Sequence, residues 1–211
     1  ATGSTDRPPS GGARGNWPLQ IDAVILAGGE GRRMGGADKA LLVLEGRSLL
    51  AHVAGRLRPQ VGRTALSANG DPARFAAFDL PVLPDARPLG PLAGILSGLG
   101  WGLANGVDAI LSCPVDAPFP PADLAARLAA ASGGSHPAHA TAGGRMHAAT
   151  ALWPVALAPA LAAFLASGAN PRIADFAAAH GSIAVEFPDA AAFVNLNTTG
   201  DLAAATAGRV R

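Results

Sequence analysis

The chain has 211 residues, is 49% hydrophobic and 15% charged, and carries a formal net charge of +1. This composition excludes disorder for most of the chain and predicts one globular domain. The small charge argues against electrostatic capture of nucleic acid or of an anionic membrane, and every apolar run is too short to span a bilayer. A single cysteine excludes an internal disulfide and a thiolate metal cluster, as is typical of a reducing cytoplasm.

Strand and helix patterns alternate along the chain after a tail, residues 1–20, that is rich in glycine and proline and is expected to be disordered. Strands are predicted at 22–27, 61–68, 80–84, 107–113, 138–142, 147–152 and 183–187. Helices are predicted at 48–57, 90–104, 121–131, 155–166, 171–179 and from Thr198 onward. This order predicts an α/β fold with a mostly parallel central sheet flanked by helices, and ligands at the carboxyl ends of the strands.

The segment LAGGEGRRMGGADK, residues 26–39, follows the first predicted strand directly. Its glycines allow backbone amides to approach phosphate oxygens, and Arg32, Arg33 and Lys39 add positive charge. It is not a Walker A loop, because Gly36 is followed by Ala37 and Asp38. It is not a dinucleotide fingerprint either, because a methionine stands where the third glycine is required. The segment therefore predicts a phosphate-binding loop of another kind.

Lys39 is the only lysine in the chain, since fifteen of the sixteen basic residues are arginine. In a chain that uses arginine so consistently, a retained lysine indicates a position that needs a compact ammonium. Chance survival of one surface lysine is the alternative.

The form LAGG-x-G-x-R-M-G-G-x-D-K-x-L closely resembles the nucleotide loop of the molybdenum cofactor guanylyltransferase family. The resemblance continues through SAN at 67–69, PD at 84–85, GPLAG at 90–94, Pro-x-Asp-x-Pro at 114–118 and NLNT at 195–198. It implies a single Rossmann-like nucleotidyltransferase domain over residues 21–208, whose N-terminal part binds GTP and whose C-terminal part binds molybdopterin. The implied reaction transfers GMP from GTP to the phosphate of molybdopterin and releases pyrophosphate, with Mg²⁺ as cofactor. Molybdoenzyme-specific chaperones and upstream molybdenum-insertion proteins are further expected partners, and the expected location is cytoplasmic.

The same resemblance implies roles for individual residues. The catalytic residues are Lys39, Arg33 and Asp116, and Asp116 also holds the metal. The expected GTP-binding residues are Leu26, Ala27, Gly28, Gly29, Gly31, Lys39, Asn69, Asp85 and Asp116. The candidates for binding molybdopterin are Asn195, Asn197, His147 and Arg145.

The residues themselves support some of these roles better than others. Asp116 follows an apolar strand, where a carboxylate is well placed to hold Mg²⁺, and the prolines at 120 and 121 place the next helix too late for it to act as a cap. Asn69 and Asp85 are equally compatible with ordinary turns, and a lone His147 with a structural role. The family usually has proline and glutamate where Thr199 and Gly200 stand, and often His-Pro in place of His147 and Ala148.

Three other functions remain open from the sequence. They are cytidylyl transfer to molybdopterin, nucleotidyl transfer to a sugar phosphate, and non-catalytic nucleotide sensing. Retention of Lys39 and Asp116 favours an enzyme over a sensor. Gly28 favours guanine, because relatives that transfer CMP commonly read LAAG where this chain reads LAGG.

Overall fold

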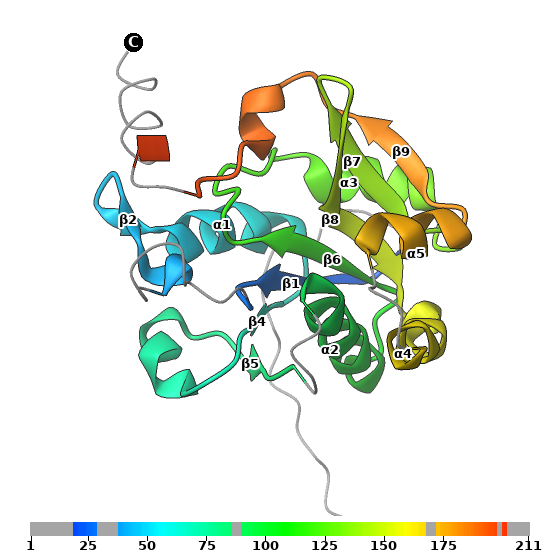
Figure 1. Cartoon of the computed structure of the whole chain (residues 1–211), viewed down its shortest axis with the longest axis horizontal. Helices are drawn as coiled ribbons and strands as arrows, with labels where there is room; N and C mark the ends of the chain where they lie inside the picture. Colours follow the sequence, from blue (N-terminus) through cyan, green and yellow to red (C-terminus); the bar gives the residue numbers. More distant parts are fainter. Residues whose placement is uncertain (1–18, 29–37, 86–89, 168–171, 198–199, 202–211) are drawn as a thin grey trace, which may run out of the picture.

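The computed structural model describes residues 19–28, 38–85, 90–167, 172–197 and 200–201. Its centre is a seven-stranded sheet with the order β5-β4-β1-β6-β8-β7-β9 (Figure 1). The strands are β1 (Ile21–Leu26), β4 (Thr64–Ser67), β5 (Val82–Leu83), β6 (Ala109–Pro114), β7 (Ala138–Ala142), β8 (Arg145–Pro154) and β9 (Ile183–Glu186). β1, β4, β5 and β6 pair in parallel, β8 is antiparallel to both β6 and β7, and β9 is parallel to β7. The prediction of a mostly parallel sheet is confirmed.

Helices cover both faces of this sheet. The α-helices in the described residues are α1 (Leu49–Leu57), α2 (Pro91–Asn105), α3 (Leu124–Ser132), α4 (Ala158–Ala166) and α5 (Ile173–Ala179). All six residues of β1 are buried, and they alternate between the faces, as expected of a central parallel strand. Ile21 and Ile25 join the core formed with α1 and α3, whereas Val24 and Leu26 join the core formed with α2, α4 and α5.

The glycines of α2 allow this helix to lie very close to the sheet. A Cβ added at Gly98 would lie 2.8 Å from Cγ1 of Val24, and one added at Gly102 would lie 2.8 Å from Cδ1 of Ile110. Pro91 occupies the first turn, where its missing N–H costs no hydrogen bond. Gly98 and Gly102 therefore bring α2 into direct contact with β1 and β6.

The structure also differs from the sequence prediction in places. The helix expected from Pro121 begins only at Leu124, because residues 122–123 form a turn. A short hairpin of β2 (Val43–Leu44) and β3 (Arg47–Ser48) was not predicted, although Glu45 and Gly46 at its turn both have positive φ, as the twist of a two-residue hairpin requires.

Four 3₁₀ helices were not predicted within the described residues: η2 (Lys39–Leu41), η3 (Arg58–Gln60), η4 (Pro72–Phe78) and η6 (Ala190–Phe193). The helix predicted at 155–166 is divided into a 3₁₀ turn, η5 (Val155–Leu157), and α4. The expected tail and most of the expected closing helix lie outside the described residues. Within those residues, none of the helices has the length and apolar character needed to cross a bilayer.

Candidate active site

The loops expected to bind ligands begin side by side at one edge of the sheet. β1, β4 and β6 end there together, because the amide of Ala27 donates to the carbonyl of Ser67 (2.9 Å) and the amide of Val115 donates to that of Leu26 (3.0 Å). In Figure 1, β1 and β6 both point toward this edge, on the side of the β2–β3 hairpin. Three of the predicted residues, Gly28, Asn69 and Asp116, follow the ends of these strands.

Lys39 contacts two residues that are distant from it in the sequence, so three parts of the chain meet at its side chain. Its Nζ donates to Oδ2 of Asp116 at 2.9 Å and to Oδ1 of Asn197 at 2.6 Å. The side chains of Lys39 and Asp116 are about one-fifth exposed, so the ion pair is shielded but remains open to a ligand. The solitary lysine therefore lies where the expected nucleotide-binding and acceptor-binding parts meet.

The backbone around Lys39 is fixed by its neighbours. Asp38 caps η2 by accepting the amide hydrogen of Ala40 at 3.0 Å. Nε of Arg74 donates to the other carboxylate oxygen of Asp38 at 2.7 Å, which links η2 to η4. The sequence analysis assigned no role to Asp38 or Arg74, although an aspartate directly before a short helix is a common cap.

Asp116 also carries an unsatisfied oxygen that fits a metal ligand. Its Oδ1 is buried and has no hydrogen-bond partner in the part of the chain that the structure describes, whereas its Oδ2 pairs with Lys39. Carboxylate oxygen is the ligand that hard divalent cations prefer. Among the described residues there is no group of three or more His, Cys, Asp or Glu side chains that could hold a metal. A cation at Asp116 would therefore complete its coordination with phosphate oxygens or water.

A second carboxylate, that of Asp85, is held at the end of β5. Oγ of Ser67 donates to Asp85 Oδ1 at 2.9 Å, and Nδ2 of Asn69 donates to Oδ2 at 3.1 Å. The amide of Asp85 donates back to Oδ1 of Asn69 at 3.0 Å. A Cβ added at Gly28 would lie 2.9 Å from Asp85 Oδ2, so the carboxylate of Asp85 lies directly beside the backbone of Gly28. Asn69, Asp85 and Gly28, which were predicted to bind GTP, therefore lie close together, and the buried Ser67, for which no role was predicted, joins them.

The residues expected to bind the acceptor lie at the start of β8 and after η6. Arg145 is exposed, and the ring of His147 stacks on Phe193 with centroids 4.8 Å apart. Burial, with a contribution from the charge of Arg145, lowers the pKa of His147, so its ring is neutral at neutral pH. His147 was predicted as an acceptor-binding residue, whereas Phe193 was not, because it lies in an alanine-rich segment in which no pattern singles it out.

This acceptor side is tied to the rest of the site by the segment 195–197. The amide of Leu196 donates to the carbonyl of Asp116 at 2.8 Å. Leu196 is buried while Asn195 and Asn197 are exposed, which is the alternation expected of an extended segment. Three of the predicted residues, Gly29, Gly31 and Arg33, lie outside the described residues.

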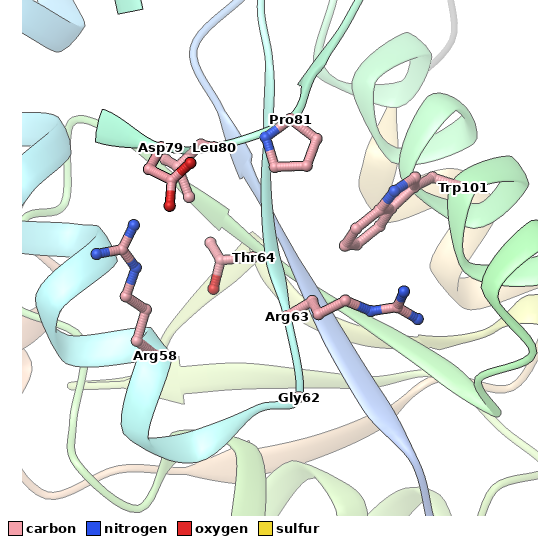
Figure 2. A pocket seen from close by; sticks show the side chains of 8 residues that line it. All are labelled: Arg58, Gly62, Arg63, Thr64, Asp79, Leu80, Pro81 and Trp101. Atoms are coloured by element: carbon pink, nitrogen blue, oxygen red, sulfur yellow. The ribbon is translucent and has the colours of Figure 1, made fainter. Parts of the chain in front are cut away.

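A separate hollow of about 410 Å³ lies at the opposite edge of the sheet, near the start of β4. Figure 2 shows Arg58, Arg63 and Trp101 arranged around it. The guanidinium of Arg63 is already engaged by Asp22 (3.1 Å) and Asn105 (2.6 Å). None of the predicted site residues lines this hollow, so it does not belong to the site at the carboxyl ends of the strands.

Comparisons with known proteins establish the family of the chain. A family model described as "MobA-like NTP transferase domain" matches residues 23–182. A molybdenum cofactor guanylyltransferase from Cereibacter sphaeroides is 57% identical over 89% of this chain and 96% of its own length, and one from Acidiphilium cryptum is 56% identical over 90% and 95%.

A solved structure, molybdopterin-guanine dinucleotide biosynthesis protein A from Archaeoglobus fulgidus, supports the fold alone. It matches with a TM-score of 0.71 at 18% identity and covers 90% of this chain and 98% of its own. Nucleotidyltransferases of the matched family generally use a divalent metal. The family model spans more than half of the chain and the relatives cover nearly all of it, so the chain belongs to the MobA-like nucleotidyltransferases, within the group named molybdenum cofactor guanylyltransferases.

Proposed function

We propose that this chain transfers GMP from GTP to the phosphate of molybdopterin and releases pyrophosphate. The observation that carries the proposal is the position of Lys39, whose ammonium contacts Asp116 on the nucleotide side and Asn197 on the acceptor side. A reaction that brings two anionic substrates together needs positive charge at their meeting point. The names of the relatives support guanylyl transfer to molybdopterin as the particular reaction.

Asp116 is the residue that would hold the metal, which we take to be Mg²⁺, through its unpartnered Oδ1. When bound, Mg²⁺ would neutralise part of the triphosphate charge, including the charge that develops on departing pyrophosphate. Among the described residues Nζ of Lys39 donates to Asp116 and Asn197, and the third N–H of the ammonium would serve a phosphate oxygen. No general base is required, because the phosphate of the acceptor is already ionised near neutral pH.

Asp85 is well placed to recognise guanine. Guanine presents two adjacent donors, the ring N1–H and the exocyclic amine, and a carboxylate can accept both in parallel. Cytosine and adenine instead present a ring nitrogen that accepts, which a carboxylate would repel. Gly28 lies beside this carboxylate, and a Cβ there would lie 2.9 Å from Oδ2, so the missing side chain leaves the carboxylate room to face the base.

On the acceptor side, Arg145 provides an exposed cation for an anionic acceptor, and the stacked His147 and Phe193 rings provide a flat aromatic surface. Asn195 lies on the exposed side of the segment that leads to Asn197. Arg33, Gly29 and Gly31 stay predicted members of the phosphate-binding loop.

The test is to incubate the protein with Mg²⁺, molybdopterin and each of the four ribonucleoside triphosphates, and to identify the product by mass. We expect molybdopterin guanine dinucleotide and pyrophosphate from GTP, with far slower transfer from the other three nucleotides. Asp116→Asn is the matched control, because it keeps the shape of the side chain but removes its charge. A cytosine dinucleotide formed from CTP as fast as the guanine dinucleotide from GTP, or absence of any dinucleotide product from the native protein, would refute the proposal.

A further inference from the structure

Ser67 is a buried side chain whose single hydroxyl is aimed at the base-recognition carboxylate. It is the last residue of β4, is only 1% exposed, and donates to Oδ1 of Asp85 at 2.9 Å. Asn69 donates to the other carboxylate oxygen. Both oxygens of Asp85 are therefore held, so the plane of the carboxylate is fixed rather than free to rotate.

The space for this hydroxyl is kept open by a glycine of α2. A Cβ added at Gly94 would lie 3.1 Å from Cβ of Ser67 and closer still to its Oγ, and would also lie 2.9 Å from Cδ2 of Leu26. Any side chain at Gly94 would displace the Ser67 hydroxyl from its present position. The close approach of α2 to β4 at Gly94 is therefore compatible with the Ser67–Asp85 hydrogen bond only because residue 94 is glycine.

We propose that Ser67 is a positioning residue that sets base selectivity by fixing the carboxylate of Asp85. Each oxygen of a carboxylate has two lone-pair directions, so the bonds from Ser67 and Asn69 leave one on each oxygen. These two remaining acceptors form a pair that matches the two adjacent donors of guanine. The inference rests on the proposed function, in which Asp85 recognises the base.

Loss of the Ser67 hydroxyl affects guanine nucleotides more than inosine nucleotides. Inosine keeps the N1–H but lacks the exocyclic amine, so it needs only one acceptor. In Ser67→Ala the carboxylate can rotate, and its second acceptor is no longer held toward the amine. The ratio of kcat/KM for GTP to that for ITP should fall about tenfold, mainly through a higher KM for GTP, with kcat nearly unchanged.

The experiment measures both nucleotides on the native protein, Ser67→Ala, Asp85→Ala and the double variant, with molybdopterin and Mg²⁺ in excess. Because the ratio is taken on one sample, it does not depend on the fraction of protein that is folded. Ser132→Ala is the matched control, since Ser132 is also buried (2% exposed) and its hydroxyl donates to the carbonyl of His136, just after α3. Its ratio should equal that of the native protein.

The expected result is a reduced ratio in Ser67→Ala and no further change when Ser67→Ala is added to Asp85→Ala. A second variant, Ser67→Cys, keeps a weak donor and should give an intermediate ratio. An unchanged ratio in Ser67→Ala, or equal losses for GTP and ITP, would overturn the inference while leaving guanylyl transfer intact. Failure of the native protein to transfer GMP would instead refute the proposed function.

Discussion

Adding one methyl group at Gly28 should change the choice of nucleotide, and the structure shows how. The new Cβ would lie 2.9 Å from Oδ2 of Asp85, whereas ordinary contact begins near 3.4 Å, so the oxygen must retreat by about 0.5 Å. That retreat breaks the bond from Asn69 or misaligns the acceptor that guanine needs. Loss of one hydrogen bond to a charged group costs about 1.5–3 kcal/mol, so kcat/KM for GTP should fall about 10- to 150-fold.

The assay for Gly28→Ala compares kcat/KM for GTP and CTP under one set of Mg²⁺ and acceptor conditions. The value of kcat/KM for CTP should change much less, because cytosine does not present two adjacent donors that need both oxygens of Asp85 as acceptors. Gly62→Ala is the matched control: its Cβ would lie 2.8 Å from a carboxylate oxygen of Asp22, at the other end of β1. It should lower stability without changing the GTP-to-CTP ratio. An unchanged ratio in Gly28→Ala, or an equal change in Gly62→Ala, would refute the reasoning.

Three further predictions concern the lysine, the packing of α2 and the dependence of stability on pH. Lys39→Ala should lower turnover about 10²–10³-fold. Lys39→Arg should recover only part of this loss, because the planar guanidinium points its N–H groups differently from an ammonium. Near-normal turnover of Lys39→Ala would contradict the proposed role of Lys39. Gly98→Ala should reduce the free energy of unfolding by about 1–3 kcal/mol, as measured by urea denaturation, because its methyl group would meet Val24. The methyl group of Gly100→Ala, in the same helix, meets nothing within 4 Å, so this variant should raise the free energy of unfolding by about 0.5–1 kcal/mol. Burial lowers the pKa of His139 and of His147, so the unfolded chain takes up protons before the folded chain as the pH falls. The stability present above pH 6.5 should therefore decline below that pH. Thermal denaturation at pH 7.5 and pH 6 measures this decline, and His139→Asn should lessen it.

The fold could be predicted from sequence because its strands and helices carry strong local patterns. β1 is a short continuous apolar run, and α1 has its apolar residues on one stripe, so both were found with errors of one residue at their ends. The weaker elements depend on tertiary contacts. The hairpin of β2 and β3 has only two residues in each strand, too few for any periodicity to appear. The start of α3 was misplaced because prolines at 120 and 121 mark a helix beginning only to within a turn.

The candidate site could be predicted only as far as its residues follow strand ends. Lys39, Asn69, Asp85 and Asp116 all do so or lie within a recognisable loop. Ser67 begins the motif SAN at 67–69, but its role was not predicted, because a buried serine inside a strand has no local pattern that separates it from ordinary core. Its role depends on the hydrogen bond that it makes across β4 and β5, and this contact exists only in three dimensions.

The contact of one ammonium with both Asp116 and Asn197 has a thermodynamic consequence. On the proposed function, a nucleotide phosphate that binds the third N–H of Lys39 would shift the ammonium relative to Asn197, and so change the environment that an acceptor meets at the segment 195–197. Linkage requires the effect to be reciprocal, so an acceptor that engages Asn197 would change the affinity for nucleotide by the same factor. Binding of the two substrates is therefore predicted to be coupled, with the first to arrive setting the affinity that the second encounters.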